Sequence, residues 1–193
     1  AEESLHLTQY SIDHITDSIV WIDKNAKYHF VNDAACRMFG YSREELLTMG
    51  VFDIDPIFPK DQWAQHWQDI IERGSFTIET VQKAKDGREF PVEVTVNFVE
   101  YNGQQYNCAV IHDITQRKQS EEQLKESEER FRNIFIHAPV GIFHSIPSER
   151  FLIANPALAG MLGYASPEEL MAAIADMSVQ LYVDPAVRPQ IVE

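Results

Sequence analysis

Three side chains of this sequence are candidates for chemistry of their own: His66, Cys36 and Asn107. The imidazole of a histidine is a normal axial ligand for haem iron, a cysteine thiolate is a nucleophile, and a side-chain amide can hydrogen bond a small polar ligand. Larger catalytic motifs are absent, since the sequence contains no Gly-rich phosphate loop, no His-Glu-x-x-His and no Gly-x-Ser-x-Gly. We therefore expect no catalysis by this chain itself.

The surroundings of His66 also fit a simpler structural role. Trp63, Trp67 and Ile70 recur at helical spacing and predict an amphipathic helix that ends at Gly74. His66 lies on the shoulder of this apolar stripe, where a partly exposed or hydrogen-bonded histidine is the simpler expectation. The two tryptophans would also crowd a haem macrocycle.

Charge and composition exclude several classes of partner. The chain has 16 Lys and Arg residues against 30 Asp and Glu residues, a formal net charge of -14 that repels nucleic acid and anionic membranes. No apolar run approaches the roughly 20 residues of a membrane helix, and Cys36 and Cys108 lack the spacing of a metal or redox pair. With no signal peptide in view, we expect a cytoplasmic protein, of which this chain is a piece.

The strongest internal pattern is a repeat. Asn32 opens the run NDAACRMFGYSREEL, and Asn155 opens the run NPALAGMLGYASPEEL 123 positions later. Such a spacing predicts two copies of one domain-sized unit. In each copy a short helix stops at a glycine, Gly40 or Gly163, and a capping box opens the next helix. The expected boxes are Ser42 with Glu45 and Ser166 with Glu169.

The first copy reads as an antiparallel sheet with helices. Residues 18–22 and 28–32 predict one hairpin, and from Ser75 onward a period of two around Asp86-Gly87 and Asn102-Gly103 predicts a three-stranded meander. The first meander turn is expected to be the three-residue loop 85–87, which places Phe76 and Ile78 on the inner face. The expected pairs in the second hairpin are Phe98 with Asn107, Val96 with Ala109 and Val94 with Ile111 on the buried face, and Asn97 with Cys108, Thr95 with Val110 and Val99 with Tyr106 on the outer face.

Asn107 therefore lies among apolar residues on the buried face, where its amide must find a partner. That partner is either a backbone group or a small polar ligand in a modest pocket. The residues expected to line such a pocket with Asn107 are Phe98, Phe76, Trp67, Met49 and Phe52. Because most of them are large and aromatic, we expect the pocket to be small or filled.

Several motifs together resemble a PAS domain with its PAC extension. They are Asn32 with Ala34 or Ala35, FGY at 39–41, SREEL at 42–46, KDGREFPVEV at 85–94 and HDITQRK at 112–118. The resemblance implies an α+β protein with the PAS fold: a five-stranded antiparallel sheet with short helices on one face, then a linker helix and a partial second unit. The implied division is an N-terminal helix at 1–11, a PAS/PAC sensor domain at 12–115, a helical linker at 116–130 and the N-terminal half of a second PAS domain at 131–193.

The same resemblance bears on the cofactor candidates. Haem-binding relatives carry their iron ligand on the long helix, which makes His66 the haem candidate. Light-sensing relatives attack a flavin with the cysteine of an Asn-Cys-Arg-Phe-Leu-Gln run, of which the sequence around Cys36 keeps only Cys-Arg. A buried free cysteine usually behaves as a small hydrophobic residue. We predict no specific cofactor.

The resemblance also implies that Asp113, Ile114 and Thr115 relay a signal from the last strand into an output helix, which the Thr115 hydroxyl is suited to cap. The predicted helix that follows has heptad core positions that include Leu124 and Phe131, but only the C-terminal half of these positions is apolar. Both a dimeric coiled coil and a solvated linker helix remain open. The second copy ends before any meander strand, so we expect it to expose apolar side chains at Ile142, Phe143, Phe151, Leu152 and Ile153.

As a whole, the resemblance implies a sensory module of a bacterial-type signalling protein. A small ligand or another stimulus would change the sheet, and the change would pass through dimer and linker-helix rearrangement to an output domain of the histidine kinase or diguanylate cyclase type. We expect a homodimer formed through the N-terminal helix and the outer sheet face. The alternatives are a ligand-free interaction scaffold and a haem-binding gas sensor.

Overall fold

The computed structural model describes residue 10 and residues 12–146, 150–176 and 180–181. The chain divides into a first unit, residues 1–120, and a second unit, residues 121–193. Most of the N-terminal helix expected at 1–11 lies outside the described residues. No helix within the described ranges is both long and apolar enough to cross a membrane.

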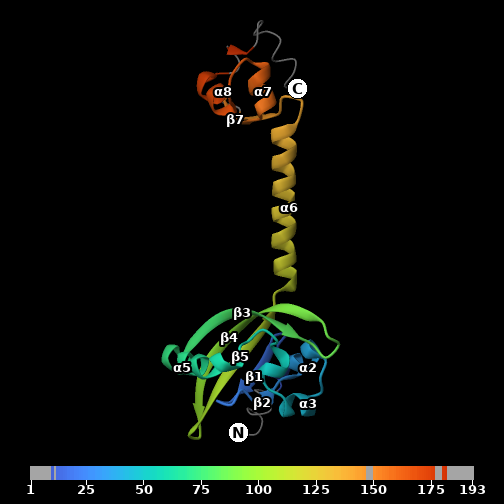
Figure 1. Ribbon diagram of the computed structural model, residues 1–193, viewed down its shortest axis with the longest axis vertical. Coiled ribbons are helices and arrows are strands. Elements are labelled where there is room, and N and C mark those ends of the chain that lie inside the picture. Colours follow the sequence, from blue (N-terminus) through green and yellow to red (C-terminus); the bar gives the residue numbers. More distant parts are fainter. Residues whose placement is uncertain (1–9, 11, 147–149, 177–179, 182–193) are drawn as a thin grey trace. The chain divides into compact units, whose positions relative to one another are not determined.

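The first unit is built on a five-stranded antiparallel sheet, which confirms the predicted fold. The strand order is β2-β1-β5-β4-β3, so the first hairpin pairs with the last strand of the chain's first unit (Figure 1). The strands are β1 (Ser18–Ile22), β2 (Tyr28–Val31), β3 (Ser75–Lys83), β4 (Glu89–Tyr101) and β5 (Gln104–Asp113). Alternate residues of these strands enter one core.

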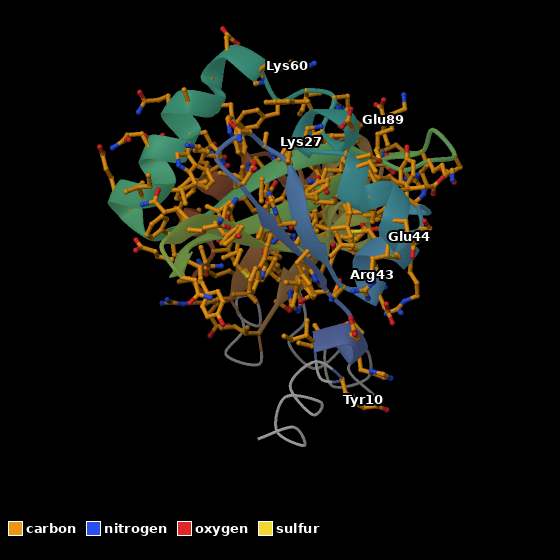
Figure 2. The ribbon with its side chains drawn as sticks, turned by 90° about the horizontal axis from the view of Figure 1, so that it is seen from below. Tyr10, Lys27, Arg43, Glu44, Lys60 and Glu89 are labelled. Atoms are coloured by element: carbon orange, nitrogen blue, oxygen red, sulfur yellow. The ribbon has the colours of Figure 1, made fainter. Side chains whose placement is uncertain are left out.

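Helices cover the inner face of this sheet. They are α2 (Asp33–Phe39), α3 (Arg43–Thr48), α4 (Val51–Ile54), the single-turn η1 (Lys60–Gln62) and α5 (Trp63–Arg73). In Figure 2, Arg43 and Glu44 mark the start of α3 and Lys60 marks the start of η1, on either side of β1 and β2. The core between sheet and helices includes Phe39, Leu46, Ile54, Trp67, Ile70, Val92, Val96 and Ile111.

Both meander turns have the predicted register. Phe76 pairs with Val96 and Ile78 pairs with Val94, as the three-residue loop requires. In the second hairpin, Phe98 pairs with Asn107, and Val94, Thr95 and Val99 also have their predicted partners. Asn102 and Gly103 both have positive φ angles, 52° and 73°, which are typical of the two-residue turn expected there.

The helix starts of the two copies are alike but not identical. Ser42 Oγ accepts a hydrogen bond from Glu45 N (3.2 Å), and Glu45 Oε2 accepts one from Ser42 N (2.9 Å), which completes the predicted capping box. At Ser166 the hydroxyl accepts from Glu169 N (3.2 Å), but Glu169 Oε2 accepts from Ala165 N (2.7 Å). The second box is therefore only half formed, because the carboxylate reaches one residue further back.

The helix that follows β5 is longer than the predicted linker. Helix α6 (Thr115–His137) begins one residue earlier than expected and runs on through Phe131 to His137. It ends shortly before the second unit's hairpin, β6 (Phe143–Ser145) and β7 (Phe151–Ala154). Two short helices follow, α7 (Pro156–Met161) and α8 (Pro167–Ala173).

The second unit has a small core of its own. Phe151, Ala154, Ala159, Leu170 and Ile174 are buried together. Phe143, Leu152 and Ile153 are exposed as predicted, and Ile142 is half-buried. The prediction was wrong for Phe151, which is 8% exposed because it lies on the inner face of β7 against α8.

Candidate functional site

The first unit has a small, partly open cavity between the sheet and the helices, with a volume of about 40 Å³. Strands β1, β2, β3, β4 and β5 contribute walls, and the segment from α4 to α5 closes it. The polar lining residues are Tyr28, Asp55, His66, Thr80, Gln82 and Asn107, and the apolar ones include Val51, Phe58, Trp63, Ile78 and Val96. A buried water occupies about 10–15 Å³ on this scale, so the cavity admits only a few non-hydrogen atoms.

Asp55 is the one carboxylate among the described residues that line this cavity. It follows α4 and is 4% exposed. Its Oδ1 accepts hydrogen bonds from Ile57 N (3.1 Å) and Phe58 N (3.0 Å), and its Oδ2 accepts one from Thr80 Oγ1 (2.7 Å). Burial raises the pKa of the Asp55 carboxyl, although these three bonds act in the opposite direction. The residue thus ties the loop before α5 to strand β3.

Gln82 and Asn107 supply two buried amides. Gln82, on β3, is 5% exposed, and its Oε1 has no hydrogen-bond partner in the described part of the chain. Asn107 Oδ1 accepts a hydrogen bond from Asn97 N (3.1 Å), the backbone alternative of the two that the sequence left open. Asn97 Nδ2 in turn donates to Cys108 O (3.1 Å), so side-chain amides join β4 and β5 at this point.

His66 lines the cavity within a ring of aromatic side chains. Its imidazole lies 5.1 Å from the Phe58 ring, 5.5 Å from the Trp63 ring and 5.6 Å from the Phe76 ring, centroid to centroid. Burial lowers the pKa of His66, so the imidazole is neutral at pH 7. A cofactor-sized pocket has a volume of about 300–1,000 Å³, and a cavity of about 40 Å³ therefore does not fit a haem at His66.

Most residues that the sequence assigned to the pocket do not line it. Asn107 does, whereas Trp67 is buried in the core and Phe98, Phe76, Met49 and Phe52 pack against the core around it. These large side chains fill the space, which agrees with the expectation of a small or filled pocket. Thr80 and Gln82 were missed, although they follow Phe76 and Ile78 at a spacing of two and so were due on the same face.

The described surroundings of Cys36 do not activate its thiol. It is half-buried on α2 beside the core, and burial raises the pKa of the thiol. A raised pKa keeps it protonated and weakly nucleophilic at neutral pH. Among the described residues, no group of three or more His, Cys, Asp or Glu side chains is placed to hold a metal ion.

The junction between β5 and α6 is the second notable arrangement. Asp113 Oδ1 accepts a hydrogen bond from Thr115 N (2.8 Å), and Ile114, 2% exposed, donates from its N–H to Pro91 O (3.1 Å). The prediction that the Thr115 hydroxyl caps the helix was wrong, because Thr115 lies inside the first turn and its buried Oγ1 has no partner in the described residues. The Asp113 carboxylate is the group that binds a free N–H at this helix start.

Ion pairs fix the first turn of α6 to the sheet. Arg117 lies 2.7 Å from Glu79 on β3 and 3.5 Å from Glu93 on β4, nitrogen to oxygen. Lys118 lies 2.6 Å from the other carboxylate oxygen of Glu79. These groups are substantially exposed, so each pair contributes little stability. These ion pairs instead fix the position of the helix start over two strands.

The outer face of the sheet carries a cluster of half-buried apolar side chains. Trp21 on β1 packs against Phe30 (5.7 Å) and Tyr106 (5.8 Å), ring centroid to ring centroid. Val99, Cys108 and Val110 extend this face, as the predicted register required. We call these six residues the outer patch.

Comparison with known proteins agrees with this geometry. A family model described as a PAS domain matches residues 16–116, and a second PAS domain model matches residues 129–189. The chain is 31% identical over 124 residues to the methyl sulfide methyltransferase-associated sensor of Methanosarcina acetivorans, a match that covers 62% of this chain and 12% of that protein. It is 27% identical over 143 residues to sporulation kinase E of Bacillus subtilis, with coverages of 74% and 19%. The chain thus spans less than a fifth of the length of either relative.

Solved structures give the same family. A PAS domain from a two-component sensor histidine kinase is 31% identical, with a TM-score of 0.51 and coverage of 58% of this chain and 97% of that one. The PAS domain of an HTR-like protein from Haloarcula marismortui shares the fold at 21% identity, with a TM-score of 0.56 and coverages of 58% and 93%. One of the two family models alone covers more than half of the sequence. The chain belongs to the PAS domain family.

Proposed function

We propose that this chain is the sensory module of a signal-transduction protein, and that its first unit passes a change in the sheet to α6. The observation that carries the proposal is the β5–α6 junction, where Asp113, Arg117 and Lys118 bind the helix start to the sheet. Two curated relatives are a sensor and a kinase by name, which supports the same class of function. The output domain that we propose is a histidine kinase or a diguanylate cyclase.

Strand β3 links the cavity to this junction. Thr80 and Gln82 line the cavity, and Glu79 of the same strand pairs with both Arg117 and Lys118. A ligand that moves or tightens β3 would therefore displace the residues that hold the first turn of α6. We propose a two-state shift in which the stimulus favours one position of the helix start.

Dimerisation is the second part of the proposal. The outer patch supplies an apolar surface on the first unit, to which the N-terminal helix would add. On α6, Leu124, Phe131 and Ile134 are 62%, 60% and 60% exposed and follow heptad positions. Pairing of two α6 helices would bury these side chains, and a cytoplasmic homodimer is the assembly that we propose.

A ligand-free scaffold is the alternative function, and the small volume of the cavity favours it. A space of about 40 Å³ fits a few water molecules as well as it fits a small ligand. In that case the PAS unit would act through its outer patch alone. Direct binding measurements on the cavity separate this alternative from a ligand sensor.

The relay is tested by Asp113→Ala in the intact protein that carries this chain, with its output measured with and without the stimulus. Asp86→Ala is the matched control, because Asp86 Oδ1 also accepts a backbone N–H, from Arg88 (2.9 Å), but lies in the exposed turn between β3 and β4. We expect Asp113→Ala to fold and to lose the response, and Asp86→Ala to keep it. A normal response in both Asp113→Ala and Arg117→Ala would remove the junction from the mechanism.

A further inference from the structure

We infer that the cavity of the first unit binds a small ammonium-type cation, ammonium or methylammonium, between Asp55 and Gln82. This inference rests on the proposed sensor function, for which it names the class of ligand. It starts from one unsatisfied atom. Gln82 lines the cavity, and its Oε1 is buried without a hydrogen-bond partner among the described residues. A buried acceptor left unpaired costs about 1–3 kcal/mol. A ligand that donates a hydrogen bond removes this cost.

Asp55 supplies the second acceptor. A carboxylate offers about four acceptor positions, and the three hydrogen bonds from Ile57, Phe58 and Thr80 leave room for one more donor. No Lys or Arg lines the cavity, and Asp55 makes no ion pair within 4.0 Å in the described part of the chain. A buried charge requires a partner of opposite sign, which a bound cation would provide.

The electrostatic environment favours a cation over an anion. The pKa of Tyr28, in the same lining, is raised first by burial and then by the negative charges of Asp55 and Asp53. His66, the remaining titratable residue of the wall, is held neutral by burial and adds no competing positive charge. An anion would meet the Asp55 carboxylate without any cationic side chain beside it.

The wall residues and the size of the cavity restrict the class of ligand further. Three of the lining residues, Tyr28, Phe58 and Trp63, are aromatic, and ammonium groups are attracted to the faces of aromatic rings. The volume of about 40 Å³ admits ammonium or methylammonium but not a tetraalkylated ammonium or an amino acid. A cation held by both Asp55 and Gln82 would also bridge the loop before α5 to strand β3, which carries Glu79.

The experiment is a titration of the full chain with ammonium chloride and with methylammonium chloride, followed by NMR on the side-chain amide of Gln82 and the backbone amide of Thr80. Sodium chloride at equal ionic strength and tetramethylammonium chloride are the ligand controls. Methanol is the neutral donor of similar size. We expect saturable shifts with ammonium and methylammonium only, over a millimolar range.

Two variants test the residues. Gln82→Leu removes the unpaired acceptor and is expected to fold at least as stably as the parent, while its affinity for methylammonium falls about tenfold or more. Asp55→Asn is expected to weaken binding by at least as much. The matched controls are Gln105→Leu on the exposed part of β5 and Glu72→Gln on the exposed face of α5, and both should bind as the parent does.

Several outcomes would overturn the inference. The first is a titration without saturable shifts, which means that the cavity holds water only. The second is equal affinity for methanol or tetramethylammonium, and the third is unchanged affinity for methylammonium in Gln82→Leu. None of them touches the proposed relay, because the Asp113→Ala experiment uses the response of the intact protein to its own stimulus. A normal response in both Asp113→Ala and Arg117→Ala, with methylammonium binding retained, would in turn contradict only the proposed function.

Discussion

Asn32 and Asn155 share three hydrogen bonds at equivalent positions of the two units. Asn32 Oδ1 accepts from Ile19 N (3.0 Å) and Ala35 N (2.9 Å), and its Nδ2 donates to Asp17 O (3.0 Å). The partners of Asn155 are Ile142 N (2.9 Å), Leu158 N (3.0 Å) and Val140 O (2.9 Å), in the same order. Each partner lies 123 positions after its counterpart, so the sequence repeat is a repeat of structure.

Removal of Asn32 should destabilise the first unit strongly. The side chain is fully buried and joins the start of β1 to the start of α2, and its Nδ2 also donates to Ile12 O (3.0 Å). In Asn32→Ala several buried backbone groups lose their partner, so we expect the free energy of unfolding to fall by more than about 2 kcal/mol. Urea denaturation of the chain measures this, with the exposed Asn25→Ala as control, for which we expect less than about 0.5 kcal/mol. Equal effects of the two substitutions would contradict the structural role.

The hairpins show what the sequence predicts well. Asn102-Gly103 defines a two-residue turn, and the alternation of Val92, Val94 and Val96 fixes which face is buried, so the register followed from local information. The equivalence of Asn32 and Asn155 was also predictable, because a sequence repeat can be recognised without knowing which residues are in contact. The sheet order was not predictable in this way, since pairing of β1 with β5 joins segments about 90 residues apart.

The cavity shows what the sequence predicts poorly. Large aromatic side chains such as Phe98 and Phe52 suggested a lining, but such residues fill volume, and the space that remains is bounded by smaller side chains from several elements. Asp55 enters the wall through a loop whose path depends on three hydrogen bonds. The signal that the sequence did contain was the pair of polar residues Thr80 and Gln82 at inward positions of a strand, because a polar side chain on a buried face needs a hydrogen-bond partner.

Two substitutions at the β5–α6 junction should have different effects on the free energy of unfolding. Asp113→Ala removes the acceptor for Thr115 N and should cost about 1 kcal/mol, the usual effect of a lost helix cap. Thr115→Val, in contrast, removes a buried hydroxyl that has no partner among the described residues, so we expect unchanged or slightly higher stability. Thermal unfolding of both variants is sufficient to measure this. A larger loss in Thr115→Val than in Asp113→Ala would mean that the hydroxyl does bind a partner.

Asp55 should make stability depend on pH. Because burial raises its pKa in the folded chain, the folded state holds its proton at pH values where the unfolded state, with a pKa of about 3.9, has lost it. The free energy of unfolding contributed by Asp55 therefore falls as the pH rises through this window. Relative to Asp55→Asn, the parent should become more stable as the pH is lowered from 7 to about 4. Urea unfolding of both proteins across this range is the measurement, and a pH-independent difference would show that the carboxyl titrates normally.

The outer patch should support association of the first unit. Val110 is a half-buried member of this patch, two positions after Cys108 on β5, where a charged side chain would be buried in a dimer. We expect the parent to sediment as a dimer at micromolar concentration and Val110→Glu to shift it toward monomer. Tyr101→Glu is the matched control, since Tyr101 is 63% exposed near the turn between β4 and β5. A parent that stays monomeric throughout, or a Val110→Glu variant that associates as the parent does, would rule out this interface.

The two units should differ in protection against hydrogen exchange. Strand β4 has a bonded neighbour on each side, β3 and β5, whereas within the described residues β6 and β7 have only each other. A two-stranded sheet is marginal in water, and the buried core behind it is the small cluster around Phe151 and Leu170. We therefore expect the amides of β6 and β7 to exchange much faster than those of residues 92–96, as measured by mass spectrometry on the intact chain. Equal protection that disappears on dilution would instead indicate that the hairpin pairs with a strand from another copy, and equal protection at every concentration would mean that the second unit is stable with this core alone.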